Sequence, residues 1–342
     1  MRVGIIGGGF GLRIQAPIIK VHPYMDVSAV CTMNRHQLPN EILRWDNPPK
    51  HYQDWTKMLN NVELDILFVS SIPIHHYEVV KYAIRKGINI VCEKPFTMNS
   101  NESWELLNLT KQSNVKVLID FEWRYLPIRQ KVKELIENNH IGQILHFEYH
   151  ISSPRYQFLH NNKLGWLGEK EKYGGMLGAL GTHMMDCLRW LVKDEIEDLS
   201  GFVHTHVPQA VEEHRDADDA FYIHGKMKSN STFSVQLISG INHAFGANLR
   251  IFGDSGTIAL TNDQELYFGK ANEQLNEINI LKPEIPTHQL SEETIAYFPA
   301  FYPFLEKVYE YIVFDILDQD LPTIEDGHAN QLIIDKVLAK AN

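Results

Sequence analysis

The first 122 residues contain short apolar runs separated by stretches with helical periodicity, and this alternation constrains the fold more than any other feature. The apolar runs predict strands at residues 3–6, 27–31, 66–69, 88–91 and 115–119. Helices are predicted between them, near residues 12–21, 53–60, 76–86 and 100–113. Strands that alternate with helices in this way predict a parallel, doubly wound sheet.

After residue 122 the pattern changes to one made mainly of strands. Helices are predicted near residues 128–138 and 182–192, with a strand at 143–151. Apolar and polar residues alternate at 221–227 and 232–237, on either side of a turn at 229–230, which predicts an antiparallel sheet with one buried face. Helices near 300–318 and 327–340 close the chain, whereas 269–298 gives no clear pattern. We therefore predict two domains, residues 1–122 and 123–342.

Length and charge narrow the class of protein. A chain of 342 residues is typical of two domains. The formal net charge is −11, and no run of lysine and arginine is present, which argues against a nucleic-acid-binding protein. No apolar stretch reaches the ~18 residues that a membrane span needs. Glycines interrupt the apolar start of the chain, so we expect no signal peptide and a cytoplasmic protein.

The cysteines and histidines do not predict a metal site. Cys31, Cys92 and Cys187 lack the spacing of metal ligands, and we expect buried free thiols in a reducing compartment. His204, Thr205 and His206 lie on a predicted strand whose successive side chains alternate between its two faces, so only every second one shares a face and a metal site there is improbable. We predict no bound metal.

A glycine-rich turn follows the first predicted strand and precedes the first predicted helix. Gly7 and Gly9 match the first two positions of the G-x-G-x-x-G pattern, but Leu12 occupies the third and Gly11 comes one residue early. Glycines at such a turn let the backbone approach a pyrophosphate at the helix N-terminus. We predict a dinucleotide site that includes Phe10 as well; the alternative is a glycine-rich turn without a ligand.

The end of the second predicted strand bears on which dinucleotide is bound. An NAD enzyme usually has an acidic residue there for the ribose 2′-hydroxyl, but this chain has Thr32, with Arg35 and His36 just after it. Without a carboxylate nothing repels a 2′-phosphate, and Arg35 could pair with it. This favours NADP over NAD, unless Arg35 is only a solvated loop residue.

Glu93, Lys94 and Pro95 follow the predicted strand at residues 88–91. Ligands of open α/β sheets bind at the carboxyl ends of the strands. A lysine at this edge could donate a proton to a substrate or place a positive charge beside its hydroxyl. The alternative is a surface lysine at a strand end.

Several motifs together resemble one family. They are Ser70-Ser71-Ile72-Pro73-Ile74-His75-His76, Cys92-Glu93-Lys94-Pro95, Phe121-Glu122-Trp123-Arg124-Tyr125, Gly174-Gly175, Gly181-Thr182-His183-Met184-Met185-Asp186, Gly253-Asp254-Ser255-Gly256-Thr257 and Glu325-Asp326-Gly327. The chain is similar over nearly its whole length to the Gfo/Idh/MocA family of glucose–fructose oxidoreductase and inositol dehydrogenase. The resemblance implies an N-terminal Rossmann domain, a C-terminal domain with an open, mostly antiparallel sheet, and homodimers or homotetramers built on that sheet.

The resemblance also implies roles for individual residues. Lys94 and His183 are expected to be catalytic and to contact the substrate, together with Trp166. The cofactor-binding set is expected to comprise Gly7, Gly9, Phe10, Gly11, Leu12, Thr32, Arg35, Ser70, Ser71, Ile72, Pro73, His76, Glu93, Lys94, Glu122 and Arg124. For His76, helix capping is a close alternative; for Glu122 and Arg124 it is a structural ion pair, and for Trp166 a place in the core.

The chain departs from the family pattern four residues before His183. The family often has an aspartate there, but this chain has Ala179. The local sequence Gly178-Ala179-Leu180-Gly181 looks like a subgroup of the family that lacks the aspartate. Thr182 is a credible N-cap, which would place His183 in the first turn of a helix, where the helix dipole favours neutral imidazole. A neutral imidazole can accept a proton from a hydroxyl. Asp186 could orient the ring or pair with Arg189.

The sequence thus predicts an NAD(P)-dependent oxidoreductase that acts on a sugar, an inositol or a related polyhydroxy compound. Two alternatives stay open. Some members of the family are redox-assisted glycosidases, and Ala179 is compatible with a catalytically silent NADP-binding or regulatory protein.

Overall fold

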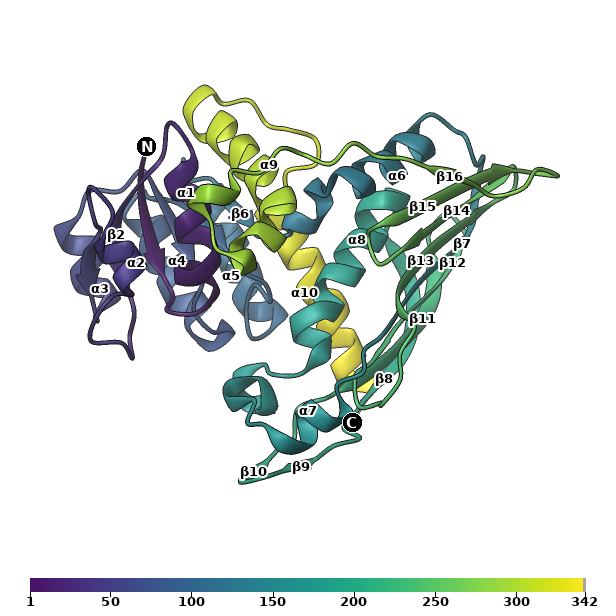
Figure 1. Ribbon diagram of the computed structural model, residues 1–342, viewed down its shortest axis with the longest axis horizontal. Helices are drawn as coiled ribbons and strands as arrows, with labels where there is room; N and C mark the ends of the chain where they lie inside the picture. The colour runs from purple at the N-terminus through teal and green to yellow at the C-terminus, as the bar shows by residue number, and fades with distance from the viewer. Residues whose placement is uncertain (341–342) are drawn as a thin grey trace. The chain divides into compact units, whose positions relative to one another are not determined.

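A computed structural model describes residues 1–340, which form two compact units (Figure 1). The first unit combines Met1–Tyr125 with Pro283–Gln331. The second combines Leu126–Lys282 with the chain from Leu332 onward. Each unit has its own sheet.

The sheet of the first unit has six parallel strands in the order β3-β2-β1-β4-β5-β6. The strands are β1 (Arg2–Ile6), β2 (Asp26–Cys31), β3 (Lys50–Tyr52), β4 (Ile66–Val69), β5 (Asn89–Cys92) and β6 (Val117–Ile119). The predicted parallel, doubly wound sheet is confirmed. Strand β3 was not predicted, because its three residues are polar or aromatic and only partly buried.

Helices and helical turns cover both faces of this sheet. They are η1 (Gly11–Gln15), α1 (Ala16–Val21), α2 (Asn40–Leu43), α3 (Trp55–Asn61), η2 (Pro73–His75), α4 (His76–Arg85), α5 (Ser100–Lys111), η3 (Glu122–Tyr125), η7 (Thr287–Gln289), α9 (Glu292–Phe314) and the start of α10 (Ile324–Lys340). Side chains of β4 alternate between two apolar cores: Ile66 and Phe68 join one, Leu67 and Val69 the other. Burial on both faces explains why β4 is apolar without interruption.

The first unit differs from the expected domain bounds of 1–122 and 123–342, because it includes Pro283–Gln331. Helix α9 explains the difference. Its apolar side chains, among them Phe301, Phe304 and Leu305, belong to the same core as strand β1. The helix begins in the stretch that gave no clear pattern, where the Ser291 hydroxyl accepts a hydrogen bond from the Thr294 N–H at 3.2 Å and caps it.

The sheet of the second unit has eight strands in the order β16-β15-β14-β13-β7-β12-β11-β8. All neighbours are antiparallel except β7 and β12, so the predicted, mostly antiparallel sheet is confirmed. The strands are β7 (Ile144–Ser152), β8 (Ile196–His204), β11 (Ala220–Met227), β12 (Thr232–Ile238), β13 (Gly246–Gly253), β14 (Gly256–Thr261), β15 (Glu265–Lys270) and β16 (Asn276–Ile278). A small separate sheet pairs β9 (Gln209–Ala210) with β10 (Glu213–His214).

One face of the eight-stranded sheet is packed and the other is largely open. The helical elements of this unit are α6 (Pro127–Glu137), α7 (Tyr156–Asn161), η4 (Gly165–Gly168), η5 (Lys170–Lys172), η6 (Leu177–Gly181) and α8 (Thr182–Val192). Helices α6 and α8 lie on the same side of the sheet (Figure 1). Phe221 and Ile223 of β11 are buried, whereas Phe202 of β8 is 53% exposed and packs on the ring of Tyr222, at 5.0 Å between centroids.

Among residues 1–340, none of the helices is long and apolar enough to cross a membrane. Within the same range, histidine, cysteine and acidic side chains form no cluster that could hold a metal ion. The three cysteines are buried free thiols.

Candidate functional site

The glycine-rich turn after β1 brings the backbone close to neighbouring segments. Gly7 has φ +153°, and a Cβ there would lie 2.2 Å from the carbonyl oxygen of Ser70. A Cβ on Gly11 would lie 2.9 Å from Ile5 Cγ2, whereas one on Gly9 would meet no described atom within 4 Å. Gly7 thus permits the tight turn, Gly11 lets the helix pack on the sheet, and Gly9 leaves the backbone accessible. These are the three glycine roles of a dinucleotide-binding turn, although the spacing is irregular.

The side chains of Phe10 and Leu12 have packing roles. Phe10 contacts the ring of Tyr297 edge-on, at 5.1 Å between centroids. Leu12 is buried in the core of the first unit. Leu12 can therefore offer only its backbone to a ligand in this turn, whereas the ring of Phe10 is only partly buried.

Arg35 lies beside the glycine turn, as expected for a residue that contacts the adenosine end of a dinucleotide. Its Nε is 3.5 Å from the position that a Cβ on Gly8 would take, and the residue is exposed. The Thr32 hydroxyl lies 2.6 Å from His51 Nε2 and 3.2 Å from the Arg35 carbonyl oxygen. Thr32 therefore fixes the loop that carries Arg35, while the guanidinium of Arg35 is presented on the outside.

Polar side chains gather where β4, β5 and β6 end. Gln15 of η1 is fully buried and donates from Nε2 to Glu93 Oε1 at 2.9 Å and to Asp120 Oδ2 at 2.8 Å. The Ser70 hydroxyl donates to Gln15 Oε1. Glu93 follows β5 and Asp120 follows the neighbouring β6, and the Asp120 N–H donates to the Cys92 carbonyl at 2.8 Å. One amide thus joins the ends of three strands.

This carboxyl cluster, defined as Glu93, Asp120 and Glu122, is electrostatically strained. Burial and, to a lesser degree, the charge of Glu93 raise the pKa of Glu122 to about 8, against the opposing effect of Lys94. Burial also raises the pKa values of Glu93 and Asp120 well above their usual range, and in both cases a neighbouring carboxyl adds to the rise. The charge of Lys94 acts on all three carboxyls. Perturbed acids beside a lysine at the carboxyl edge of a sheet are typical of a functional site.

Sequence reasoning identified Glu93, Lys94 and Glu122, but it missed Gln15 and Asp120. Gln15 lies in the first helical turn after the glycines, and its contact with Asp120 spans 105 positions of sequence. Asp120 directly follows the apolar run of β6, which was the one available signal. The peptide between Lys94 and Pro95 is cis.

His76 is held by the protein backbone. It is fully buried, with Nδ1 2.9 Å from the Pro95 carbonyl oxygen and Nε2 2.9 Å from the Ser71 carbonyl oxygen. Burial lowers the pKa of His76. The N-cap of α4 is His75, and both ring nitrogens of His76 face carbonyl oxygens outside the helix, so the ring ties the loop after β4 to the loop after β5.

The loop after β4 places the remaining expected cofactor residues near the same strand ends. Ser70 is buried, and Pro73 begins the helical turn η2 with Ile72 as its N-cap. The Ser71 hydroxyl is buried and has no hydrogen-bond partner among the described residues. An orphaned buried hydroxyl beside strand ends suits a site that receives a ligand.

Arg124 is tied to the chain that returns to the first unit. Its Nη2 forms an ion pair with Asp326 Oδ1 at 3.1 Å, and Nη1 donates to the Asp320 carbonyl at 3.2 Å. Arg124 is almost fully buried. These contacts favour the structural alternative for this residue.

His183 lies in the second unit, near the start of α8, and is 4% exposed. The expected N-cap is wrong, because the Thr182 hydroxyl donates to the Gly178 carbonyl at 2.8 Å and Gly181 already has helical dihedrals. A π-helical turn, η6, leads directly into α8, so the helical run begins at Leu177. His183 is therefore further from the positive end of the helix dipole than the sequence implied. Arg189 forms an ion pair with Glu195 at 2.6 Å.

Asp218 anchors the start of this helical run, and sequence reasoning missed it. Its Oδ2 accepts a hydrogen bond from the Leu177 N–H at 2.8 Å, and its carbonyl oxygen accepts one from the Met176 N–H at 3.0 Å. Burial raises the pKa of Asp218 to about 7. A Cβ on Gly175 would lie 2.1 Å from Asp218 Oδ1, which explains the glycine there.

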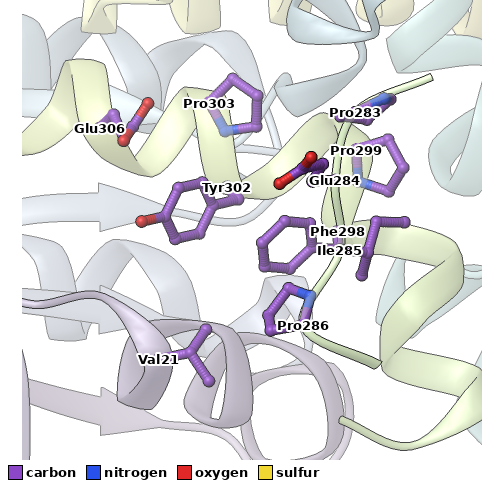
Figure 2. Close-up of a pocket in the computed structure, with 10 residues that line it drawn as sticks. All are labelled: Val21, Pro283, Glu284, Ile285, Pro286, Phe298, Pro299, Tyr302, Pro303 and Glu306. Atoms are coloured by element: carbon purple, nitrogen blue, oxygen red, sulfur yellow. The ribbon is translucent and has the colours of Figure 1, made fainter. Parts of the chain in front are cut away.

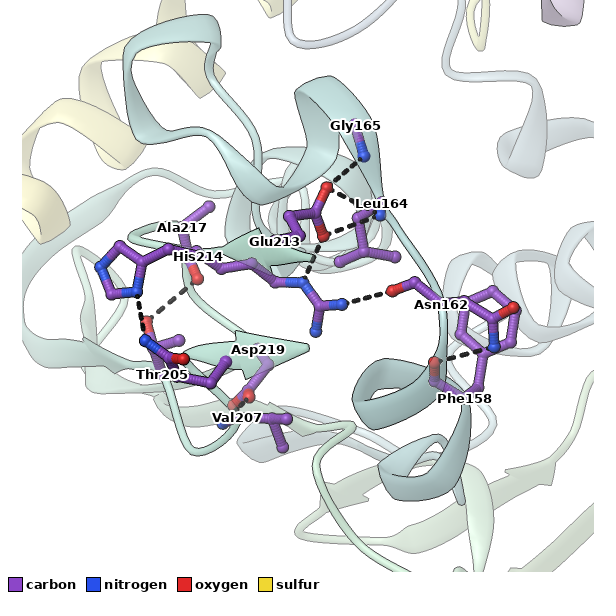
Figure 3. A network of polar contacts seen from close by, with 12 residues as sticks. Phe158, Asn162, Leu164, Gly165, Thr205, Val207, Glu213, His214, Ala217 and Asp219 are labelled. Carbon is purple, nitrogen blue, oxygen red and sulfur yellow. Dashed lines mark hydrogen bonds and ion pairs between the residues drawn. The ribbon is translucent and has the colours of Figure 1, made fainter. Parts of the chain in front are cut away.

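Trp166 lies in η4 and is partly buried. The loop before it is held by Glu213, whose carboxylate accepts hydrogen bonds from the Leu164 N–H at 2.9 Å and the Gly165 N–H at 2.9 Å (Figure 3). Arg215 pairs with Glu213 at 2.7 Å and donates to the Asn162 carbonyl. This network fixes the loop that carries Trp166.

A cavity of about 520 Å³ in the first unit does not coincide with the expected site residues (Figure 2). It is lined mainly by prolines and aromatic side chains, together with two glutamates: Val21, Pro283, Glu284, Ile285, Pro286, Phe298, Pro299, Tyr302, Pro303 and Glu306. No residue of the glycine turn or of the carboxyl cluster lines it.

The Rossmann sheet, the open glycine turn and the ionisable groups at the strand ends define an oxidoreductase that binds a nicotinamide dinucleotide. Residues 1–121 match the oxidoreductase family with an NAD-binding Rossmann fold, and residues 129–259 match the GFO/IDH/MocA C-terminal domain. The chain belongs to the GFO/IDH/MocA family of oxidoreductases.

Relatives of this chain include named sugar dehydrogenases. An uncharacterised oxidoreductase of Synechocystis sp. is 28% identical over 272 residues, which cover 77% of this chain and 72% of the relative. Levoglucosan dehydrogenase of Pseudarthrobacter phenanthrenivorans is 27% identical over 224 residues, and the match covers 61% of this chain but only 55% of that enzyme. Glucose-6-phosphate 3-dehydrogenase of Bacillus subtilis is 22% identical, with 99% of this chain and 96% of the enzyme covered.

Solved structures share the fold. Levoglucosan dehydrogenase in complex with NADH and L-sorbose matches with a TM-score of 0.84 at 21% identity, covering 100% of this chain and 96% of that one. An oxidoreductase from Agrobacterium radiobacter in complex with NAD+, L-tartaric acid and magnesium matches with a TM-score of 0.83 at 15% identity, with the same coverage.

Proposed function

We propose that this protein is an NAD(P)-dependent dehydrogenase or reductase acting at a carbinol or carbonyl carbon of a sugar, an inositol or a related polyhydroxy compound. The observation that carries the proposal is the position of Lys94, which follows β5 at the carboxyl edge of the Rossmann sheet and acts electrostatically on three neighbouring carboxyls. The names of the relatives point to the substrate class, because levoglucosan and glucose 6-phosphate are both sugars.

The residues of the first unit fit a nicotinamide dinucleotide. Gly7, Gly9 and Gly11 leave the turn open to a pyrophosphate, with the first helical turn directly behind it. Ser71 supplies a buried hydroxyl beside the strand ends. The bound nicotinamide would supply or accept the hydride.

Lys94 is proposed as the group that handles the proton. In the reducing direction its Nζ donates a proton to the substrate oxygen as that oxygen gains electron density; in the oxidising direction it accepts the hydroxyl proton. His183 of the second unit is proposed as a base or relay for the same proton. Trp166, at the end of a loop fixed by Glu213, is proposed as a substrate contact.

We propose NADP as the preferred cofactor. Arg35 lies beside Gly8 at the edge of the turn, and Thr32 stands where a carboxylate would repel a 2′-phosphate. A guanidinium can pair with a phosphate through two parallel hydrogen bonds, which a ribose hydroxyl cannot match.

We also propose that the open face of the eight-stranded sheet forms a homodimer or homotetramer interface. Phe202 of β8 is 53% exposed and packs on the ring of Tyr222 of the neighbouring β11, which alternates along the strand with the buried Phe221 and Ile223. Exposed aromatic side chains on the unpacked face of a sheet are typical of an interface.

The proposed function is tested by measuring turnover on a panel of sugars, sugar phosphates and inositols. The absorbance of the nicotinamide band reports turnover, with NADPH and with NADH in separate assays. Turnover on at least one polyhydroxy substrate is expected. Tight cofactor binding without turnover on any of them would favour the second candidate, a silent NADP-binding protein, which the alanine at position 179 makes worth testing.

A further inference from the structure

The first unit contains a cavity that the proposed function does not use (Figure 2). Its volume of about 520 Å³ is within the ~300–1,000 Å³ that is typical of small-molecule sites. One wall is formed by residues 283–286 and the other by helix α9, while Val21 of α1 completes the lining. All of these residues belong to the first unit. The cavity is therefore a property of that unit alone.

Helix α9 presents a graded stripe of side chains to the cavity. Phe298, Tyr302 and Glu306 are spaced by four residues, so they lie on one side of the helix. The rings of Phe298 and Tyr302 stack, with centroids 4.7 Å apart and planes 18° from parallel. Phe298 is buried, Tyr302 is partly buried and Glu306 is exposed. An apolar surface thus leads to an acidic one along the same wall.

Two prolines inside α9 add acceptor oxygens to this wall. A proline has no N–H, so Pro299 and Pro303 cannot complete the helix hydrogen bonds to the carbonyls of Ile295 and Pro299. The ring of a helical proline lies against the carbonyl four residues earlier. Because both proline rings line the cavity, these two carbonyl oxygens are on the cavity side of the helix. The absence of their usual helix donor favours a ligand that brings N–H groups.

Glu284 and Glu306 place one carboxylate on each wall of the cavity (Figure 2). Neither carboxylate forms a hydrogen bond or an ion pair with any described residue, and the same holds for hydrogen bonds of the Tyr302 hydroxyl. The lining includes no lysine, arginine or histidine. A concave surface with charge of one sign attracts ligands of the other sign. The cavity is therefore suited to a cation.

The lysines nearest to the lining residues in the sequence do not supply that cation. Lys307 Nζ pairs with Glu310 Oε2 at 2.8 Å, further along α9. Lys20 Nζ, near the end of α1, lies 3.8 Å from Asp26 Oδ1. Lys282 is exposed, does not line the cavity and forms no ion pair with the described residues. Within residues 1–340, the positive charge that the two walls attract must come from a ligand.

The lining also narrows the chemistry of the cation. A metal ion does not fit, because histidine, cysteine and acidic side chains of the described residues form no group of three that could hold one. Prolines and aromatic rings make up most of the lining, and such a surface suits a ligand with an apolar body. Aromatic rings also attract organic cations through their faces.

We infer that this cavity binds a small organic cation, namely an ammonium group carried on an apolar body. The ammonium group is held by Glu284 and Glu306, and the apolar body packs against Phe298, Tyr302 and the neighbouring prolines. The inference does not depend on the proposed function, since none of these residues belongs to the glycine turn or to the carboxyl cluster.

Calorimetric titration of the full chain with two matched probes tests the charge requirement. Phenethylamine is a cation at pH 7, whereas phenethyl alcohol has the same ring and chain but is neutral. The amine is expected to bind saturably and more tightly than the alcohol, because only the amine gains the attraction of the two carboxylates. Equal affinity for the two probes, or no saturable binding of the amine, would overturn the inference.

Substitutions of the two glutamates then test which groups hold the ammonium. Glu284→Gln and Glu306→Gln should each raise the dissociation constant of phenethylamine by ~3–5-fold, as expected for one exposed charge pair. The double variant should bind the amine no more tightly than the alcohol. Glu292→Gln is the matched control, because Glu292 is an exposed acid of α9 that does not line the cavity. An unchanged dissociation constant in the double variant, or an equal rise in the control, would refute the assigned site.

Methyl NMR spectra locate the bound probe. Val21 and Ile285 line the cavity from α1 and from the segment before α9, so their methyl resonances should shift as phenethylamine is added (Figure 2). Methyl groups of the second unit, such as those of Ile223, should keep their positions. Shifts confined to the second unit, or unchanged resonances of Val21 and Ile285 at saturation, would place the amine elsewhere and overturn the inference.

Discussion

Substitution of Glu122 by glutamine should change how the stability of the protein depends on pH. The folded structure raises the pKa of this carboxyl from 4.5 to about 8, with burial as the main cause. Below pH 4.5 the group is protonated in both the folded and the unfolded chain. Between these two values the folded protein keeps a proton that the unfolded chain has lost, so the unfolding free energy falls as pH rises. Above the folded pKa the fall is complete.

The size of the effect follows from the shift in pKa. Each pH unit within this window lowers the unfolding free energy by about 1.4 kcal/mol, so three units, from pH 5 to pH 8, correspond to about 4 kcal/mol. Glutamine has the same shape but cannot ionise. The unfolding free energy of Glu122→Gln should therefore gain about 4 kcal/mol relative to the wild type over this range.

Urea denaturation followed by circular dichroism at several pH values between 5 and 8 measures this difference. Glu78→Gln is the matched control, because Glu78 is an exposed acid on α4 of the same unit. The control should show the pH dependence of the wild type. Equal pH dependence in Glu122→Gln and the wild type would refute the electrostatic account of the cluster.

Three further predictions concern single substitutions. Gly7→Ala should lower the unfolding free energy by ~1–3 kcal/mol in urea denaturation, because its Cβ would lie 2.2 Å from the Ser70 carbonyl oxygen. Gly9→Ala should keep the wild-type stability and weaken cofactor binding in calorimetry. Equal losses of stability in the two variants would contradict the assigned glycine roles. Arg35→Ala should reduce the ratio of NADH to NADPH dissociation constants, and an unchanged ratio would rule out the phosphate contact. Lys94→Ala should lower kcat by ~10²–10⁴-fold while cofactor still binds, and near-normal turnover would place the chemistry elsewhere.

The sequence by itself determined the class of fold and one part of the candidate site. Uninterrupted apolar runs such as β4 require burial on both faces, and only a parallel sheet covered by helices supplies that. The glycine turn could be recognised because Gly7 and Gly9 lie between a predicted strand and a predicted helix. Lys94 was readable because it lies two residues after an apolar strand, next to Glu93 and Pro95.

The tertiary structure alone decided which groups meet. Gln15 and Asp120 are joined across 105 positions of sequence. The neighbouring strands β5 and β6 bring Glu93 and Asp120 to the same edge, where the Gln15 amide reaches both, and no local pattern encodes that contact. Helix α9 joins the first unit through its aromatic side chains, although it follows the strands of the second unit in the chain. The helical run before His183 begins at Leu177 because Asp218, 41 positions away, binds its first N–H. A long-range partner replaces the local cap there, so the helix start has no signature in the neighbouring sequence.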